Sequence, residues 1–287
     1  MIVVSVPAGI HMVPLIHCLT RLGISQTQKR KMKRSGTIYI NNAIASLMTP
    51  VSAGDHITVD FAANKPAIVP RPGPLSIVYE DDSLLIADKP AGMLVHPTVK
   101  LETGTLANAV LFYYQQQNLL YDFHPVTRLD KNTSGLVLIA KQANIHRLLN
   151  NPEKITKEYL AIAGGSVISE SGIIDAPIQR HPDSIIQRII HPDGQSAVTH
   201  FRVLQRFATA TLVSLKLITG RTHQIRVHMA YIGHPLLGDD LYGGSEEKID
   251  RQALHAAKLE LLHPISGKAI QVSSSMPPDM QELLKLV

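Results

Sequence analysis

Residues 124–141 read HPVTRLDKNTSGLVLIAK, a segment in which a polar turn runs directly into an apolar strand. The second half, from Gly135 to Ala140, is an unbroken apolar run bounded by turn residues and a lysine. Such a short run is typical of a strand that is buried on both faces. The first half is rich in side chains that hydrogen-bond their own backbone, which favours a turn at residues 131–135. The segment therefore predicts a buried strand directly after a polar turn.

One carboxylate, that of Asp130, stands at the start of this turn. Arg128 lies two residues before it, and the turn offers hydroxyl and backbone N–H donors nearby. A carboxylate beside a cation and several donors has a low pKa and stays ionised, so it can act as a nucleophile or a base at neutral pH. The same pattern is also typical of an ordinary turn aspartate, so this segment alone leaves both interpretations open.

The composition is that of a globular protein. The chain has 287 residues, of which 45% are hydrophobic and 18% charged, enough for one large domain or two. Cys18 is the only cysteine, which excludes an internal disulfide and a cysteine-based metal site and favours a reducing compartment. The sequence predicts neither a signal peptide nor a membrane span. We therefore expect a cytoplasmic protein that does not enter a membrane.

Residues 12–62 have the pattern of a small separate domain. Residues 1–60 hold six cations and two anions, which give +4 of the net charge of +5. We predict a basic helix over residues 26–34, followed by strands at 38–40 and 56–61. Five of the six cations fall within one short stretch: Lys29, Arg30, Lys31, Lys33 and Arg34. Such a cluster is either a solvated helix face or a set of contacts to nucleic-acid phosphates.

A linker follows at residues 63–74, which contain four prolines and show no periodicity. The larger domain is then expected at residues 75–287, and it alternates strand and helix patterns. The predicted strands are 76–79, 84–87, 135–140, 156–163, 197–205, 208–217 and 254–262, and the predicted helices are 104–117, 143–149, one from residue 223 and one from residue 278.

A second motif-rich segment occupies residues 218–244. Residues 219–222, TGRT, predict a turn that leads into a helix beginning HQIRVHM at His223. Gly233 and Pro235 end this helix, and the loop that follows reads LLGDDLYGG at residues 236–244. This segment therefore offers cations and carboxylates close together in sequence.

Taken together, these motifs resemble the RluA family of pseudouridine synthases, from about Leu75 to the end of the chain. The resemblance rests on several separated motifs in the same order: DKPAG at 88–92 with HP at 96–97, GTL at 104–106 with NA at 108–109, residues 128–141, KEY at 157–159, residues 220–228, and LHA at 254–256 with HP at 263–264. The family's central motif usually has histidine directly before the arginine, whereas Thr127 stands there in this chain.

The resemblance implies an α+β fold of the pseudouridine synthase type. Its central sheet is mixed but mostly antiparallel, and helices flank it. Residues 12–62 resemble the small α/β RNA-binding domain named after ribosomal small-subunit protein four. The implied activity is the conversion of uridine in structured RNA into pseudouridine. No cofactor is predicted, because the sequence contains neither a phosphate-loop motif nor Gly-x-Gly-x-x-Gly. The RNA would be rRNA or tRNA, with rRNA favoured by the accessory domain.

The resemblance also implies roles for individual residues. Asp130 matches the catalytic carboxylate, Tyr159 the tyrosine that packs on the target base, and Arg226 the cation that pairs with the carboxylate. Arg128 is implied in RNA contact or in ejection of the target nucleotide. A base inside a helix cannot reach a carboxylate, so the nucleotide must be flipped out or already unpaired.

The sequence also bears on a metal site and on two other functions. A metal site is not predicted, because His223 and His228 are five residues apart and do not share a helix face, while His181 and His191 precede prolines in turns. A glycosidase would need a second carboxylate facing Asp130, for which Asp239 and Asp240 are the candidates. The other alternative function is that of a non-catalytic RNA-binding or ribosome-assembly factor on the same fold. We expect a monomer, because the sequence shows no surplus apolar stripe.

Overall fold

The computed structural model describes residues 2–24, 29, 32, 37–60, 68–98, 101–119, 121–150 and 154–287. The chain divides into two compact units, Met1–Ala67 and Ile68–Val287. Among the helices of the described residues, none combines the length and the apolar character that a bilayer crossing requires.

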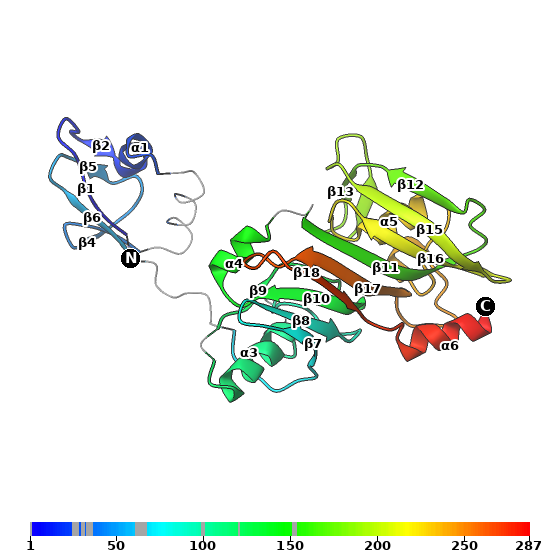
Figure 1. The fold of residues 1–287 in the computed structure, drawn as a ribbon. Helices are drawn as coiled ribbons and strands as arrows, with labels where there is room; N and C mark the ends of the chain where they lie inside the picture. The colour runs from blue at the N-terminus through cyan, green and yellow to red at the C-terminus, as the bar shows by residue number, and fades with distance from the viewer. Residues whose placement is uncertain are drawn as a thin grey trace. The chain divides into compact units, whose positions relative to one another are not determined.

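The smaller unit is built on a four-stranded antiparallel sheet, seen in blue in Figure 1. Its strands, in sheet order, are β1 (Ile2–Ser5), β6 (His56–Asp60), β3 (Thr37–Ile40) and β4 (Ala43–Ala45). Helix α1 (Leu15–Arg21) buries Leu15, Cys18 and Leu19 in one core with residues of β3 and β6. Strand β1 lies ahead of the predicted start at residue 12 and pairs with β6.

The larger unit is organised by a ten-stranded sheet (Figure 1). Its main path runs β12 (Ser171–Asp175), β15 (Val198–Arg206), β16 (Ala210–Leu217), β11 (Ile155–Gly164), β17 (Leu254–Leu262), β10 (Ser134–Ala140), β8 (Leu84–Lys89) and β7 (Ser76–Glu80). Strand β18 (Ala269–Ser273) pairs with β17, and β9 (His124–Pro125) pairs with β10. In this sheet β10 and β17 run parallel and the other described pairs are antiparallel. The predicted mixed, mostly antiparallel sheet is therefore confirmed.

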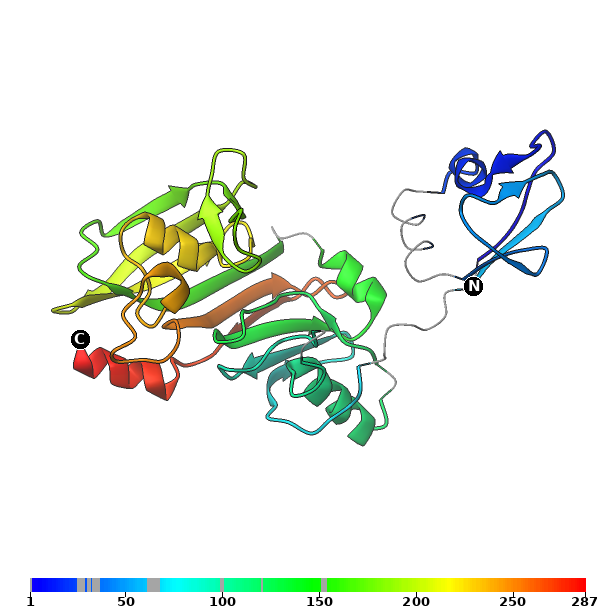
Figure 2. The same cartoon turned by 180° about the vertical axis from the view of Figure 1, so that it is seen from behind.

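Helices pack against the strands of this sheet, as Figures 1 and 2 show. They are α3 (Leu106–Gln116), α4 (Ala143–Leu148), α5 (Gln224–Tyr231) and α6 (Pro278–Leu286). Helix α3 begins at a capping box, in which Thr105 and Asn108 bond each other's backbone N–H. A hairpin of β13 (Ile178–Arg180) and β14 (Arg188–Ile190) and the short helix η2 (Asp240–Tyr242) lie near α5.

Strand β10 is buried on both faces, as its apolar run predicts. All seven of its residues are buried. Leu136 and Leu138 pack into a core with residues of α4, while Val137 and Ile139 pack into a core with residues of α3. This alternation follows from the two-residue period of a strand, which sends successive side chains to opposite faces. Because two cores hold it, β10 fixes the position of the turn that carries Asp130.

The parallel pairing of β10 with β17 depends on Gly135. Its φ is +110°, a conformation that strongly favours glycine, and the residue lies opposite Ala256. A Cβ added there would lie 2.3 Å from the Ala256 carbonyl oxygen and 2.6 Å from its nitrogen. The absence of a side chain therefore allows the two backbones to approach at the centre of the sheet.

We expect Gly135→Ala to lower the free energy of unfolding by more than about 3 kcal/mol, because β10 or β17 must move. The matched control is Gly233→Ala, since Gly233 also has a positive φ (+83°) but has no atom within 4 Å of an added Cβ. The control should lose only about 1–2 kcal/mol from backbone strain. Urea unfolding measures both, and equal losses would show that the close approach is not the constraint.

Candidate active site

Asp130 projects from the turn that precedes β10. The Thr133 backbone N–H donates to the Asp130 carbonyl oxygen (3.2 Å), which closes the turn. The neighbouring Leu129 packs against two of the apolar cores, so the backbone on that side is anchored as well. The Asp130 side chain keeps 28% of its surface exposed. The carboxylate is thus held in place and still open to a substrate.

Lys89 fixes this turn from β8. Its ammonium is fully buried and donates to the carbonyl oxygens of Pro90 (2.9 Å), Met93 (2.8 Å) and Lys131 (3.1 Å). Burial lowers the pKa of Lys89 to about 7, while the three carbonyl acceptors match the three protons of its charged form. Lys89 therefore joins the loop after β8 to the residue that follows Asp130.

The opposite side of the turn is held by residues that precede β17. Gln252 donates to the Thr133 hydroxyl (3.2 Å), and Arg251 donates to the Asn132 carbonyl oxygen (3.2 Å). Arg251 also makes a bidentate pair with Asp279 of α6, at 2.6 and 2.9 Å. The turn is consequently bonded to β8, to the segment before β17 and, through Arg251, to the last helix.

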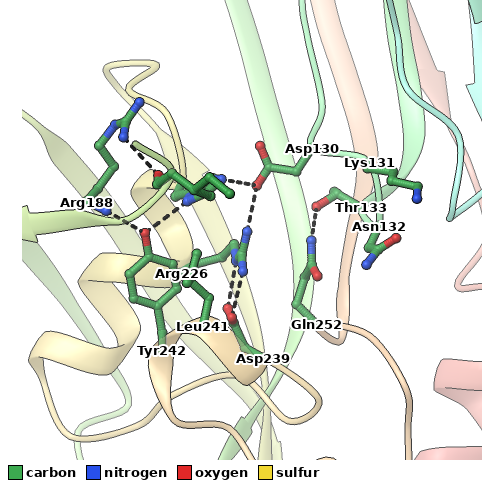
Figure 3. Close-up of polar contacts among 12 residues, drawn as sticks. Asp130, Lys131, Asn132, Thr133, Arg188, Arg226, Asp239, Leu241, Tyr242 and Gln252 are labelled. Carbon is green, nitrogen blue, oxygen red and sulfur yellow. Dashed lines mark hydrogen bonds and ion pairs between the residues drawn. The ribbon is translucent and has the colours of Figure 1, made fainter. Parts of the chain in front are cut away.

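Arg226 of α5 is the cation that meets Asp130. Its Nη1 lies 3.3 Å from Oδ2 of Asp130 (Figure 3). Its Nε and Nη2 donate to the two oxygens of Asp239, each at 2.7 Å, and its guanidinium lies 5.0 Å from the centre of the Tyr242 ring. Burial alone would lower the pKa of Arg226, but the hydrogen bonds and charge of Asp239, with the charge of Asp130, raise it. The guanidinium is therefore a fixed, permanent charge beside Asp130.

Asp239 pairs with Arg226 and does not face an open surface as a second glycosidase carboxylate would. It has no exposed surface, and both its oxygens accept from the guanidinium. Its neighbour Asp240 is exposed and caps Leu241 N–H. The sequence did not assign this role to Asp239. The one local feature that marks this position in the sequence is Gly238, directly before Asp239. In the structure Gly238 has a φ of +72°, and an added Cβ would clash with the backbone of Arg251 and Ile249.

Tyr159 lies on β11, where it is paired with Leu215 of β16 and Ala256 of β17. The register between β11 and β17 shifts at Glu158/Tyr159, and such bulges re-aim a side chain. The tyrosine is buried in one core with residues of α5, and Leu129 packs against that core. Burial, with the charge of Asp130 nearby, raises the pKa of Tyr159, so its phenol is neutral at pH 7. The structure thus brings Tyr159, Arg226 and Asp130 to one place.

The residues predicted to bind RNA are found in different settings. Arg128 is exposed, two residues before Asp130. Lys29 is only 3% exposed and donates to the Thr20 hydroxyl (2.8 Å), which does not match an exposed phosphate-binding cation. Thr20 lies on α1, so the ammonium of Lys29 is directed toward that helix and away from solvent. The other four cations, Arg30, Lys31, Lys33 and Arg34, lie outside the described residues.

The histidines weighed as metal ligands have other partners. His181 and His191 accept hydrogen bonds from the backbone N–H groups of Asp183 and Asp193, as expected for turn-capping residues. His228 is buried between Thr199 and the Ala176 carbonyl oxygen. Within the described residues, no three His, Cys, Asp or Glu side chains are grouped so that they could hold a metal ion.

Comparison with known proteins shows to which family this chain belongs. The family model for RNA pseudouridylate synthases matches residues 83–231. A Bacillus subtilis protein described as an uncharacterized RNA pseudouridine synthase, YjbO, is 40% identical over 92% of this chain and 95% of its own. The chain belongs to the RNA pseudouridylate synthase family. It is accordingly an enzyme, so the alternative of a non-catalytic RNA-binding factor is not supported.

Two further proteins named as pseudouridine synthases are similar to this chain in sequence or in structure. Ribosomal large subunit pseudouridine synthase D of Escherichia coli is 40% identical, over 83% of this chain and 78% of that protein. The human RNA pseudouridylate synthase domain containing 1 has a solved structure that superposes with a TM-score of 0.58 at 27% identity, covering 70% of this chain and 83% of that one. The predicted pseudouridine synthase fold is therefore confirmed.

We predict that Asp239→Asn impairs this synthase through Arg226. The variant leaves a buried guanidinium with one neutral partner, which we expect to cost about 3 kcal/mol of unfolding free energy. We also expect turnover to fall by about 10–10²-fold, because Arg226 is no longer aimed at Asp130. Asp240→Asn is the matched control and should change neither quantity. Full activity of Asp239→Asn would contradict the anchoring role.

Proposed function

We propose that this synthase isomerises uridine in ribosomal RNA and that Asp130 is the carboxylate that carries out the reaction. The observation that supports this best is the 3.3 Å contact between Arg226 and one oxygen of a partly exposed Asp130. The buried, neutral Tyr159 stands near the same carboxylate. An ionised oxygen beside an open surface, with an aromatic residue close by, suits attack on the sugar of an extruded nucleotide.

The reaction moves one bond of the nucleotide. The bond from N1 of the base to C1′ of the ribose breaks, the base rotates, and a bond from C5 to C1′ forms. The proton on C5 is then lost and N1 gains one, so the net change needs no cofactor. Asp130 either adds to C1′ or removes a proton from the sugar, and both routes start from its ionised oxygen.

Tyr159 and Arg128 complete the proposed site. Tyr159 is the aromatic side chain that the family resemblance assigns to packing on the target base, and its neutral phenol adds no charge that would repel RNA. Arg128 is exposed beside the carboxylate, where a guanidinium can bind a phosphate of the target strand or occupy the space that the flipped nucleotide leaves. Both interactions orient the nucleotide so that its sugar faces Asp130.

The choice of ribosomal RNA rests on the relatives and on the smaller unit. The similar Escherichia coli protein is by name a ribosomal large subunit synthase. The smaller unit has the basic cluster at residues 29–34 and resembles an RNA-binding domain named after ribosomal small-subunit protein four. Such a unit adds phosphate contacts outside the catalytic unit. A cytoplasmic location and a monomeric state stay predictions.

We expect Asp130→Asn to abolish isomerisation, by roughly 10³-fold or more, while RNA binding persists. The amide keeps the shape of the side chain but cannot attack or accept a proton. The assay measures tritium released from transcripts that carry [5-³H]uridine, because only conversion to the C-glycoside frees the hydrogen on C5.

Asp122→Asn is the control for this experiment, since Asp122 lies eight residues before Asp130 and is 73% exposed. It should release tritium at the normal rate. Normal turnover by Asp130→Asn would remove this residue from the mechanism. Release from tRNA but not from ribosomal transcripts would contradict the proposed substrate and leave the chemistry intact.

We further expect neutralisation of Arg30, Lys31, Lys33 and Arg34 to weaken RNA binding. The slope of log affinity against log salt should fall by about 0.7–0.9 for each phosphate that the variant no longer neutralises. Filter binding across a series of salt concentrations gives this slope. In the control, the exposed Lys268 and Lys285 of the larger unit are neutralised, and the slope should not change. An unchanged slope in the first variant would identify the cluster as a solvated surface.

A further inference from the structure

His223 occupies an unusual place at the start of α5. It precedes the first helical residue and has a φ of +57°, in the left-handed region that non-glycine residues seldom adopt. Gln224 holds this conformation, because its side-chain oxygen accepts from the Arg221 backbone N–H (2.9 Å) and the Thr219 hydroxyl (2.8 Å). Backbone strain maintained in this way is concentrated at functional sites.

The fold places the His223 ring beside Asp130, the proposed catalytic carboxylate. Its side chain is 11% exposed, and Nε2 lies 3.8 Å from Oδ2 of Asp130. Arg226 stands three residues later on the same side of the helix and meets the same oxygen. Figure 3 shows Arg226 directed at one oxygen of Asp130, and the same oxygen is the one nearest to Nε2 of His223. Among the described residues, no hydrogen-bond donor reaches the other oxygen, Oδ1.

Hydrogen bonds on the far side of the ring determine where its proton resides. The Arg188 backbone N–H donates to the Tyr242 hydroxyl (3.0 Å), and the same hydroxyl lies 2.9 Å from Nδ1 of His223. A backbone N–H can only donate, so the Tyr242 oxygen accepts there. Within the described part of the chain, Nδ1 is the one acceptor within reach of the hydroxyl proton. This arrangement favours a tyrosine that donates to Nδ1, in which case a neutral imidazole carries its proton on Nε2, which faces Asp130.

The charges around the ring favour this neutral form. Burial lowers the pKa of His223 below its ordinary value of 6.5, and the cations of Arg226 and Arg188 lower it further, while Asp130 and Asp239 act in the opposite direction. The ring is thus uncharged at pH 7, as a donor of fixed geometry requires. Protonation in acid would place a second proton on Nδ1 and disrupt the bond from Tyr242.

We propose that His223 is a positioning residue whose Nε2–H, oriented by Tyr242, restrains Oδ2 of Asp130 together with Arg226 and leaves Oδ1 as the oxygen that reacts with the ribose. This inference rests on the proposed role of Asp130. A separation of 3.8 Å is too long for a hydrogen bond, but such distances in unliganded active sites are often long and shorten in the complex with substrate. The residue transfers no proton in this scheme.

Three substitutions of His223 test the proposal. The amide nitrogen of glutamine can take the place of Nε2, whereas that of asparagine takes the place of Nδ1 and does not extend to Asp130. We expect His223→Ala and His223→Asn to lower kcat by about 10–10²-fold with little change in KM, because the carboxylate is misplaced while the RNA is still bound. His223→Gln should recover most of the activity. Equal losses in the Asn and Gln variants, both folded by circular dichroism, would overturn the proposal.

A double-mutant cycle tests the part that Tyr242 plays. Tyr242→Phe should reduce kcat in the wild-type background, because it no longer selects the Nε2–H form. It should have little effect in the His223→Gln background, which has no tautomer to select. The exposed Tyr231→Phe is the control and should have no effect in either. If Tyr242→Phe costs the same in both backgrounds, its role is packing alone and the proposal fails.

A final measurement is independent of the RNA substrate. In protein labelled with ¹⁵N-histidine, the chemical shifts of the signals that vanish in His223→Gln report the tautomer. We expect an unprotonated Nδ1 and a protonated Nε2 at pH 7, and a mixture in Tyr242→Phe. A protonated Nδ1 would overturn this inference even if Asp130→Asn is inactive. Normal turnover by Asp130→Asn would instead overturn the proposed function and leave the tautomer result unaffected.

Discussion

The guanidinium of Arg226, shared between two carboxylates, is the interaction on which the site depends. A buried cation is costly unless it is paired, and Asp239 provides the bidentate partner that makes burial possible. One nitrogen, Nη1, remains for Asp130, which is partly exposed. The two carboxylates therefore differ in setting: the enclosed one fixes the cation, and the other is partly open to solvent. This division distinguishes the site from that of a glycosidase, in which two carboxylates flank one sugar bond.

The strand that follows Asp130 and the helix that carries Arg226 are each held by the packed fold. Strand β10 is held by two cores, and Lys89 fastens the turn before it with three hydrogen bonds to backbone carbonyl oxygens. Helix α5 is held by His228, whose buried ring bonds to the Thr199 hydroxyl and to the Ala176 carbonyl oxygen. Asp130 and Arg226 thus come from two separately anchored elements. Their contact is set by the framework and not by the flexibility of either side chain.

The chain divides at Ala67/Ile68 into two compact units. Under the proposed function, the two units would meet different physical requirements. Isomerisation needs a charge at a fixed distance from one sugar, and the proposed carboxylate for this step lies in the larger unit. Binding of a long RNA needs many contacts with phosphates, and we propose that the basic smaller unit adds such contacts.

Strands β9, β12, β13, β14 and β18 were not predicted from the sequence. Local patterns did predict the other strands and the α-helices of the larger unit, the burial of β10 and the turn that carries Asp130. These features depend on residues within a few positions of one another, through side-chain periodicity, capping and turn preferences. The motifs also indicated Asp130, Tyr159 and Arg226, although their proximity was implied only by the resemblance. The exposed setting expected for Lys29 was not found, because its burial depends on how α1 packs.

The tertiary structure alone decided which of these side chains touch. Asp130 and Arg226 are 96 residues apart, and they meet because the sheet places β10 beside β17 and β17 beside β11, with α5 packed over that region. From the sequence, Asp239 is a candidate second carboxylate and His223 a candidate metal ligand, whereas the fold places Asp239 against Arg226 and His223 beside Asp130. No local pattern encodes such pairings, because the order of strands and the path of loops are set by packing across the whole unit.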